Sequence, residues 1–349
     1  MPNWEKPKYT SENVTVVIPT IHNRPEELRP SLESILACKP AKLILVTTWN
    51  KHEALSRVAA TLRVPDCAAP IEIDVLHVDK ANKRLQVCKA LEEDHVKTPI
   101  TVMADDDVEW PSTLMPWLLA PFEDDKMGGV GTCQRVKRVD GDVMTRVFNW
   151  LGAAYIERRN FEISATHNID GGTSCMSGRT GAYRTEILKS YDFLGNFKNE
   201  RWGRYILNAD DDNFVTRWLV AHQWKTWIQY HAECEIETTL ENSTKFLYQC
   251  SRWARSNWRS NWTSLVREKH VFTYVFWPSL LSGLVLTNKL LVSSPGPRMR
   301  CILLPSPRWP SFLTLSCSSR VGGVRKAGSL GTATSCSGQR LCSCLVLPR

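Results

Sequence analysis

Short apolar runs alternate with amphipathic stretches over the first part of the chain, and this alternation limits the possible fold more than any other feature. The amphipathic stretches predict helices at 24–39, 51–62 and 83–94, and the apolar runs predict strands at 14–19, 41–48, 71–79 and 99–107. Strands that alternate with helices favour a mostly parallel sheet with helices on both faces. The sequence therefore predicts an α/β fold in which ligands bind at the carboxyl ends of the strands.

The pattern is more mixed after the fourth predicted strand. Residues 128–136 indicate a further strand, 143–163 form an amphipathic stretch, and a helix is expected to follow Asp211. A segment rich in Trp and Arg, 246–262, precedes an apolar segment at 271–292.

The predicted strand at 99–107 ends in three consecutive aspartates. If the strand continues through them, Asp105 and Asp107 lie on one side and Asp106 points away, because side chains alternate along a strand. An Asp-x-Asp pair of this kind suits Mg²⁺ or Mn²⁺, which bind oxygen ligands and substrate phosphates. The alternative is a solvated acidic turn or a helix N-cap.

A second aspartate triplet, 210–212, precedes the later predicted helix. Carboxylates at a helix N-terminus are stabilised by capping and by the helix dipole, which is one explanation. The other is that one carboxylate acts as a general base toward an acceptor hydroxyl.

The segment "QCSRWARSNWRSNW" contains a Q-x-x-R-W pattern formed by Gln249, Arg252 and Trp253. An arginine can bind a departing diphosphate with two hydrogen bonds, and a Trp face can stack on a sugar ring. On a helix, Arg252, Arg255 and Arg259 share one face, so the segment is typical of a basic helix in a membrane interface. A solvated basic helix with packed tryptophans is the alternative.

The net charge of +8 does not indicate a nucleic-acid partner. The chain has 44 Lys and Arg against 36 Asp and Glu, and the excess equals the eight basic residues that follow Ser293. The body is therefore neutral, and we expect no nucleic-acid binding. The segment 294–349 contains no acidic residue, so it is either a disordered basic tail or translated intron-derived or frame-shifted sequence.

The apolar segment 271–292 is long enough to span a membrane. Pro278, Asn288 and Lys289 interrupt it, and a buried core helix is the alternative. No secretory signal opens the chain, so we expect a membrane protein of the plasma membrane or endomembranes whose catalytic domain faces the cytosol.

These features together resemble the family 2 glycosyltransferases of the polysaccharide synthase type, which include hyaluronan, chitin and cellulose synthases. The chain is most similar to the fungal hyaluronan-synthase-like type 2 glycosyltransferases. The resemblance covers residues 13–293 and rests, in order, on "VVIPT", "MADDD", "SCMSGRTGAYR" with "NADDDNFVTRWL", and "QCSRW".

The resemblance implies a GT-A fold, which is a Rossmann-like nucleotide-sugar-binding domain. It implies a UDP-sugar donor, a growing β-linked polysaccharide as acceptor, Mn²⁺ or Mg²⁺ as cofactor, and a lipid membrane as partner. It implies that Asp107 holds the metal and Asp211 is the catalytic base. The implied donor-binding residues are Thr20, Lys83, Arg84 and Asp105. The residues implied at the acceptor and diphosphate are Cys175, Ser177, Gly178, Gln249, Arg252 and Trp253.

We therefore expect a GT-A domain over 13–240, an interfacial segment over 241–270, a membrane helix over 271–292 and a basic tail over 294–349. Two features depart from the family. The strand at 41–48 ends in Thr47 and Thr48, without the usual acidic residue that contacts the base, and the family has several membrane helices where this chain shows one. Two other functions remain open, namely an inactive remnant that binds nucleotide only, and a nucleotidyltransferase.

Overall fold

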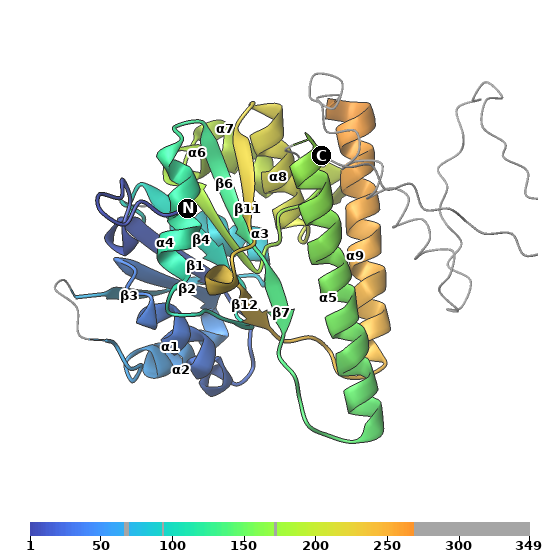
Figure 1. Ribbon diagram of the computed structural model, residues 1–349. Helices are drawn as coiled ribbons and strands as arrows, with labels where there is room; N and C mark the ends of the chain where they lie inside the picture. Colours follow the sequence, from blue (N-terminus) through green and yellow to red (C-terminus); the bar gives the residue numbers. More distant parts are fainter. Residues whose placement is uncertain (66–69, 93, 171–172, 269–349) are drawn as a thin grey trace, which may run out of the picture. The chain divides into compact units, whose positions relative to one another are not determined.

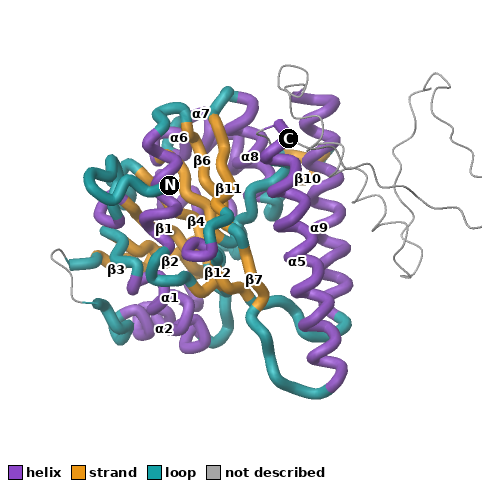
Figure 2. The backbone as a smooth tube through the Cα atoms, viewed as in Figure 1, coloured by secondary structure: helices purple, strands orange, loops and turns teal. Residues whose placement is uncertain are grey.

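The computed structural model describes residues 1–65, 70–92, 94–170 and 173–268. Within these residues the core is a seven-stranded sheet in the order β11-β6-β8-β4-β1-β2-β3 (Figures 1 and 2). Its strands are β1 (Val14–Pro19), β2 (Lys42–Thr48), β3 (Glu72–Val78), β4 (Ile100–Ala104), β6 (Met127–Thr132), β8 (Thr180–Arg184) and β11 (Lys225–Gln229). The predicted strands at 14–19, 41–48, 71–79 and 99–107 correspond to the first four of these.

All neighbouring strands pair in parallel except β8, which runs antiparallel to both β4 and β6. The sheet is thus mostly parallel, and α/β is the fold class, as the sequence predicted. Thr20 follows β1 and Asp105 follows β4, so both lie at the carboxyl ends of parallel strands, where ligands bind in such sheets.

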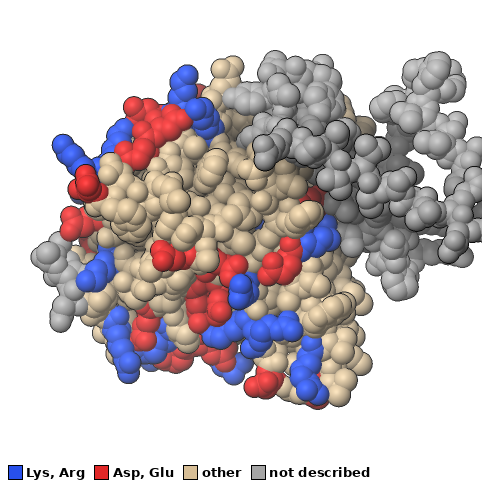
Figure 3. Space-filling view, in the orientation of Figure 1, with Lys and Arg blue, Asp and Glu red and all other residues tan. Residues whose placement is uncertain are grey.

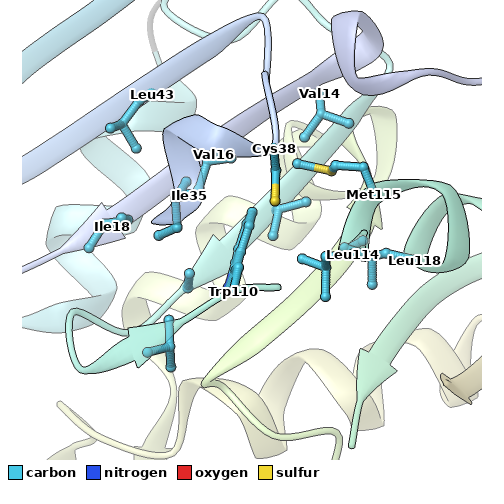
Figure 4. Packing of buried hydrophobic residues seen from close by; sticks show 14 of the residues in the cluster. Val14, Val16, Ile18, Ile35, Cys38, Leu43, Trp110, Leu114, Met115 and Leu118 are labelled. Carbon is cyan, nitrogen blue, oxygen red and sulfur yellow. The ribbon is translucent and has the colours of Figure 1, made fainter. Parts of the chain in front are cut away.

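Helices cover both faces of the sheet. On one face lie α1 (Arg29–Ala37), α2 (Trp49–Ala59) and α4 (Leu114–Leu119), whose buried residues form one cluster with Val14, Val16 and Ile18 of β1. Figure 4 shows this core, with Trp110 between residues of β1, α1 and α4. On the other face lie α3 (Lys83–Glu92), α6 (Thr185–Leu188), α7 (Tyr191–Asn199) and α8 (Asp211–Ala221), whose buried residues form one cluster with Val17. The alternation of side chains along β1 accounts for the two cores.

Close packing of α8 against β6 depends on glycine. A Cβ atom at Gly129 would lie 2.7 Å from the Leu219 side chain, which is closer than carbon atoms approach. Because α8 begins with Asp211, this contact contributes to placing the second aspartate triplet over the sheet.

Two small sheets flank the core. The first has the order β5-β12-β7, formed by β5 (Val108–Glu109), β12 (Ile236–Thr238) and β7 (Gln134–Val136). The second pairs β9 (Arg201–Trp202) with β10 (Tyr205–Ile206). Short 3₁₀-helices are η1 (Ser11–Asn13), η2 (Pro25–Leu28), η3 (Ala120–Glu123) and η4 (Ala232–Cys234).

Two long helices, α5 (Val143–Asp170) and α9 (Lys245–Trp262), lie side by side next to the sheet (Figures 1 and 2). A separate apolar cluster joins them, with the Tyr155 ring 6.2 Å from Phe246 and 5.4 Å from Trp253 between ring centroids. The amphipathic stretch predicted at 143–163 is thus part of a longer helix, and the segment at 246–262 is helical as predicted. A π-helical turn, η5 (Thr263–Glu268), follows α9.

No helix in the described part of the chain is both long and apolar enough to cross a membrane. The predicted membrane helix at 271–292 and the tail at 294–349 lie outside the described residues. On the face shown in Figure 3, acidic and basic side chains are interspersed and do not form a continuous basic stripe.

Candidate active site

A cavity of about 410 Å³ opens at the carboxyl ends of the central strands. Its walls come from the turn after β4, the start of α3, the segment before β8, the turn before α8, and the facing sides of α5 and α9. The predicted site residues that line it are Lys83, Asp105, Asp107, Cys175, Ser177, Gly178, Asp211, Gln249, Arg252 and Trp253. Segments from positions 83 to 257 thus meet in one place.

The first aspartate triplet is a turn and does not continue the strand, because β4 ends at Ala104. The Asp105 amide donates to the Arg179 carbonyl (3.0 Å), which fixes the start of this turn. All three carboxylates line the cavity, and the Asp106 carboxylate accepts a hydrogen bond from the Thr20 hydroxyl. The strand alternation that would have turned Asp106 away from Asp105 and Asp107 therefore does not apply here. Thr20 itself reaches the site only through Asp106.

Asp107 is a carboxylate placed among like charges. Burial and the charges of Asp105 and Asp106 raise its pKa to about 6, against the opposing charge of Arg179. Asp107 makes no ion pair with the described residues, and its carboxylate accepts a long hydrogen bond from the Thr238 hydroxyl at 3.5 Å.

The setting of Asp107 suits a divalent cation, since bringing a positive charge to crowded carboxylates relieves their repulsion. The described residues contain no preformed group of three or more His, Cys, Asp or Glu that could hold a metal ion. A cation here would therefore use Asp107 together with oxygens of a bound diphosphate.

Lys83 joins the two aspartate triplets. Its ammonium nitrogen lies 2.7 Å from Asp105 Oδ1 and 2.8 Å from Asp211 Oδ2. Burial alone would lower the pKa of Lys83, but the two carboxylates raise it well above its ordinary value. The site therefore holds a permanent positive charge between its two acidic clusters.

Asp211 is the first residue of α8, and its side chain is 10% exposed. Burial would raise its pKa, but the charge and hydrogen bond of Lys83, together with the charge of Arg84, lower it below the ordinary value. For Asp212, burial and the neighbouring Asp211 charge raise the pKa. Of these two carboxylates, Asp211 is therefore held ionised, while Asp212 protonates more readily.

Capping does not explain the second triplet. Asp210 occupies the N-cap position of α8, but its side chain makes no capping hydrogen bond. Asp212 Oδ1 accepts from the backbone amide (2.8 Å) and the side-chain amide (3.4 Å) of the adjacent Asn213, and its Oδ2 accepts from the Gly178 amide at 3.4 Å. All three aspartates of the triplet line the cavity.

Arg84 does not lie where the resemblance implied. It is fully buried and does not line the cavity. Its guanidinium donates to the carbonyls of Phe197 (2.8 Å) and Ala209 (3.0 Å) and pairs with Glu200 (2.5 Å). Consecutive residues on a helix point about 100° apart, so Lys83 faces the cavity while Arg84 faces α7 and α8. The structure thus gives Arg84 a supporting position, and of these two basic residues only Lys83 lines the cavity.

The segment before β8 closes one wall tightly. A Cβ atom at Gly178 would lie 3.3 Å from Lys83 Nζ and 3.4 Å from Asp212 Cβ. The Cys175 thiol is buried, and its pKa is raised well above the ordinary value by burial and by the charge of Asp212. Cys175 is therefore a protonated thiol in the wall and not a nucleophile.

Helix α9 brings Gln249, Arg252 and Trp253 to the cavity. The Arg179 guanidinium lies 5.4 Å from the Trp253 ring centroid and donates to Thr238 (2.9 Å). The predicted single basic face is not maintained, because Arg255 is exposed while Arg259 turns inward and pairs with Asp210.

Several lining residues were not among the predicted site residues, and Arg159, Arg179, Ser256 and Asn257 are four of them. Arg179 lies within the quoted stretch "SCMSGRTGAYR". Ser256 and Asn257 lie one turn beyond Arg252 and Trp253, so helical spacing was the available signal for them.

Comparison with known proteins identifies the family. The pattern described as "Glycosyltransferase like family 2" matches residues 12–256. The chain belongs to glycosyltransferase family 2. A protein of Gibberella zeae named "Type 2 glycosyltransferase" is 72% identical over 273 residues, covering 78% of this chain and 50% of the relative. One of the same name from Pyricularia oryzae is 68% identical, covering 78% and 55%.

A more distant relative is "NDP-glycosyltransferase ltbB" of Aspergillus luteorubrus. It is 28% identical over 267 residues, covering 74% of this chain and 63% of the relative. The chain spans about half the length of the fungal type 2 glycosyltransferases it matches. The mixed α/β sheet is consistent with the GT-A domain expected from the sequence.

Proposed function

We propose that this family 2 glycosyltransferase transfers a sugar from a UDP-sugar to a hydroxyl of a growing β-linked polysaccharide, with inversion at the anomeric carbon. The observation that carries the proposal is the meeting of two acidic clusters in one cavity, bridged by Lys83. The cluster at 105–107 is suited to the donor diphosphate and a metal cation, and the cluster at 210–212 supplies a base.

Asp211 is the base in this proposal. It accepts the proton of the acceptor hydroxyl, whose oxygen forms a bond to the anomeric carbon as the bond to the diphosphate breaks. UDP leaves with the electron pair, and attack from the face opposite UDP inverts the configuration. Its low pKa keeps Asp211 ionised at neutral pH, so the proton-accepting form is present.

The donor side is formed by Lys83, Arg252 and Asp107, with Asp105 and Thr20 behind them. The positive charges of Lys83 and Arg252 offset the negative charge of the diphosphate. A bound Mn²⁺ or Mg²⁺ would supply further neutralisation of the leaving group, held by Asp107. The relative named as an NDP-glycosyltransferase supports a nucleoside-diphosphate donor.

The acceptor side is formed by Trp253 with Cys175, Ser177 and Gly178. An aromatic ring in the wall of the same cavity as the base suits stacking on a sugar ring, which supports a saccharide acceptor. The polymer itself is part of the proposal and comes from the resemblance to polysaccharide synthases.

We also propose that the protein is associated with a plasma membrane or endomembrane, with this domain in the cytosol. Exposed Leu247, Tyr248 and Trp258 on the basic helix α9 support this, as does the apolar run at 271–292. Sedimentation of the full chain with vesicles of anionic phospholipid tests it, and a chain that stays in the supernatant at low salt would remove the membrane from the proposal.

The decisive experiment is UDP release by the full chain across a panel of UDP-sugars, with and without Mn²⁺. Asp211→Asn should reduce release by about 100- to 10,000-fold, the usual contribution of a general base, while UDP binding stays within about threefold. Asp192→Asn is the matched control, because Asp192 is an exposed acid in the first turn of α7.

Other outcomes identify other functions. A nucleotidyltransferase would release pyrophosphate from a nucleoside triphosphate, and an inactive remnant would bind UDP without releasing it from any sugar. Asp107→Ala should weaken Mn²⁺-dependent UDP binding, and unchanged binding would remove the metal assignment.

A further inference from the structure

Asp210 has an unusual backbone. Its φ of +65° and ψ of +32° place a residue with a side chain in the left-handed region, directly before the proposed base. Such residues are costly unless the surrounding structure holds them in place, and they are frequent at functional sites. The position therefore needs an explanation beyond starting a helix.

The Asp210 side chain supplies that explanation, because it reaches across to α9. It is 6% exposed, its Oδ1 accepts a hydrogen bond from Ser256, and its Oδ2 pairs with the Arg259 guanidinium. Both partners lie on the buried side of α9, one helical turn apart. The carboxylate thus contacts a second helix instead of capping its own.

The backbone of the same turn is held from the opposite side. The buried Arg84 guanidinium donates to the carbonyl of Ala209 (3.0 Å) and to that of Asp210 (3.1 Å). The fully buried Arg84 of α3 and the partly buried Arg259 of α9 therefore both contact Asp210, the residue that precedes Asp211.

Further polar contacts join α8 to α9 around this point. Arg217 donates to the Ser260 hydroxyl (2.7 Å), and the Asn213 amide group lies 3.4 Å from Asn257 Oδ1. The interface at the start of α8 is thus built from directional contacts, which fix one alignment of two helices more strictly than apolar packing does.

The alignment matters because each helix carries part of the site. Helix α8 begins with Asp211, and α9 carries Gln249, Arg252 and Trp253 into the same cavity. Asp210 joins the two helices at this point, because it directly precedes Asp211 and contacts Ser256 and Arg259 of α9.

We propose that Asp210 is a positioning residue that holds α9 against the turn before Asp211 through its contacts with Ser256 and Arg259. These contacts set the distance between Asp211 and the side chains of Gln249, Arg252 and Trp253, so sugar transfer requires that they are intact. This inference rests on the proposed sugar transfer for its effect on rate, but the contact itself can be tested without turnover.

The first test is Asp210→Asn, measured in the full chain. Asparagine tolerates the left-handed conformation and keeps an acceptor for Ser256, so only the charge pairing with Arg259 is lost. Because a misplacement of about 1 Å can cost about 100-fold in rate, we expect kcat to fall about 10- to 100-fold. The UDP dissociation constant should change by less than about threefold, since no donor-side residue is altered. Amide hydrogen exchange within 245–262, measured by mass spectrometry, should accelerate at least about tenfold.

The second test approaches the contact from α9. Arg259→Gln should reproduce the loss in kcat, Arg259→Lys should restore part of it, and Asp210→Asn with Arg259→Gln should be no worse than either change alone. Arg255→Gln is the matched control, because it removes one exposed arginine from the same helix and should leave kcat and exchange unchanged.

Unchanged exchange in α9 for both Asp210→Asn and Arg259→Gln would overturn the proposed contact, whatever the activity. Faster exchange with unchanged kcat would leave a structural contact only and overturn its part in catalysis. If the unmodified chain turns over no nucleotide sugar, the proposed function fails while the exchange measurement still decides whether the contact exists.

Discussion

The ammonium group of Lys83 lies 2.8 Å from the carboxylate of Asp211, so the cation expected to meet the donor also holds the proposed base. The same ammonium group contacts Asp105 at 2.7 Å. A negatively charged diphosphate would compete with both carboxylates for Lys83. Donor binding and the basicity of Asp211 are therefore linked through one side chain.

Lys83→Met should shift the acidic limb of the kcat/KM profile toward higher pH. Lys83 lowers the pKa of Asp211, and without Lys83 the effect of burial, which raises that pKa, dominates. Asp211 must be ionised to accept a proton, so activity would be lost at a higher pH than in the unmodified chain. The measurement is UDP release between pH 4 and 9.

Lys80→Met, at an exposed lysine just before α3, is the control and should leave the profile in place. An acidic limb that stays in place in Lys83→Met would mean that Asp211 is not the group that the profile reports.

Asp107→Asn should stabilise the fold in metal-free buffer at pH 7.5. The folded-state pKa of about 6 lies above the ordinary 3.8, so the folded chain loses stability as pH rises through this range. The expected gain is about 1–3 kcal/mol in the free energy of unfolding, and it should fade as pH falls from 6 to 4. Urea denaturation at several pH values measures it.

The exposed Asp140→Asn is the control for this change and should leave the free energy of unfolding within about 0.5 kcal/mol. Destabilisation by Asp107→Asn at every pH would show that the carboxylate has a favourable protein partner and is not held ready for a cation.

Gly178→Ala should slow transfer without destabilising the fold. The new Cβ would press on Lys83 Nζ at 3.3 Å, so the lysine must move by a few tenths of an ångström. A displacement of that size should lower kcat/KM for the donor about 2- to 10-fold, since about 1 Å can cost about 100-fold. Steady-state kinetics with the identified UDP-sugar measure it.

Gly195→Ala is the paired change in α7, where an added Cβ meets nothing within 4 Å. It should leave kcat/KM unchanged and stabilise the helix by about 0.5–1 kcal/mol, because alanine restricts the unfolded chain more than glycine does. Equal kinetics for the two variants would exclude the effect of the new methyl group on Lys83.

Arg84→Met should destabilise the protein by about 3–5 kcal/mol, because it leaves Glu200 and three backbone carbonyls without their buried donor. The exposed Arg57→Met should cost less than about 1 kcal/mol. Chemical denaturation compares them. Wild-type stability combined with lost UDP binding would instead place Arg84 at the diphosphate.

The first four strands could be predicted from the sequence because each is an apolar run between turn signals. The shared cavity was also foreseeable in part, since Asp105 and Thr20 follow strands that the fold makes parallel. The turn at Asp105–Asp107 was expected only as an alternative to a continued strand, because a local pattern does not show where the hydrogen bonds of β4 stop. The last of them, from the Asp105 amide, goes to the carbonyl of the distant Arg179.

Contacts between distant buried polar groups were the least predictable. Nothing near Arg84 in the sequence indicates that its partners lie at Glu200 and Ala209, more than a hundred residues away. The inward turn of Arg259 likewise depends on Asp210, which belongs to another helix. Such positions follow from tertiary packing and not from helical periodicity.

The position of β8 governs the order in which the domain can be assembled. Strands β1 to β4 can pair as soon as residue 104 has emerged from the ribosome, but β6 reaches β4 only through β8, which ends at Arg184. A nascent chain therefore carries half a sheet with an open edge for some eighty residues. Exposed strand edges promote aggregation, so we expect the nascent chain to be most prone to aggregate during this interval.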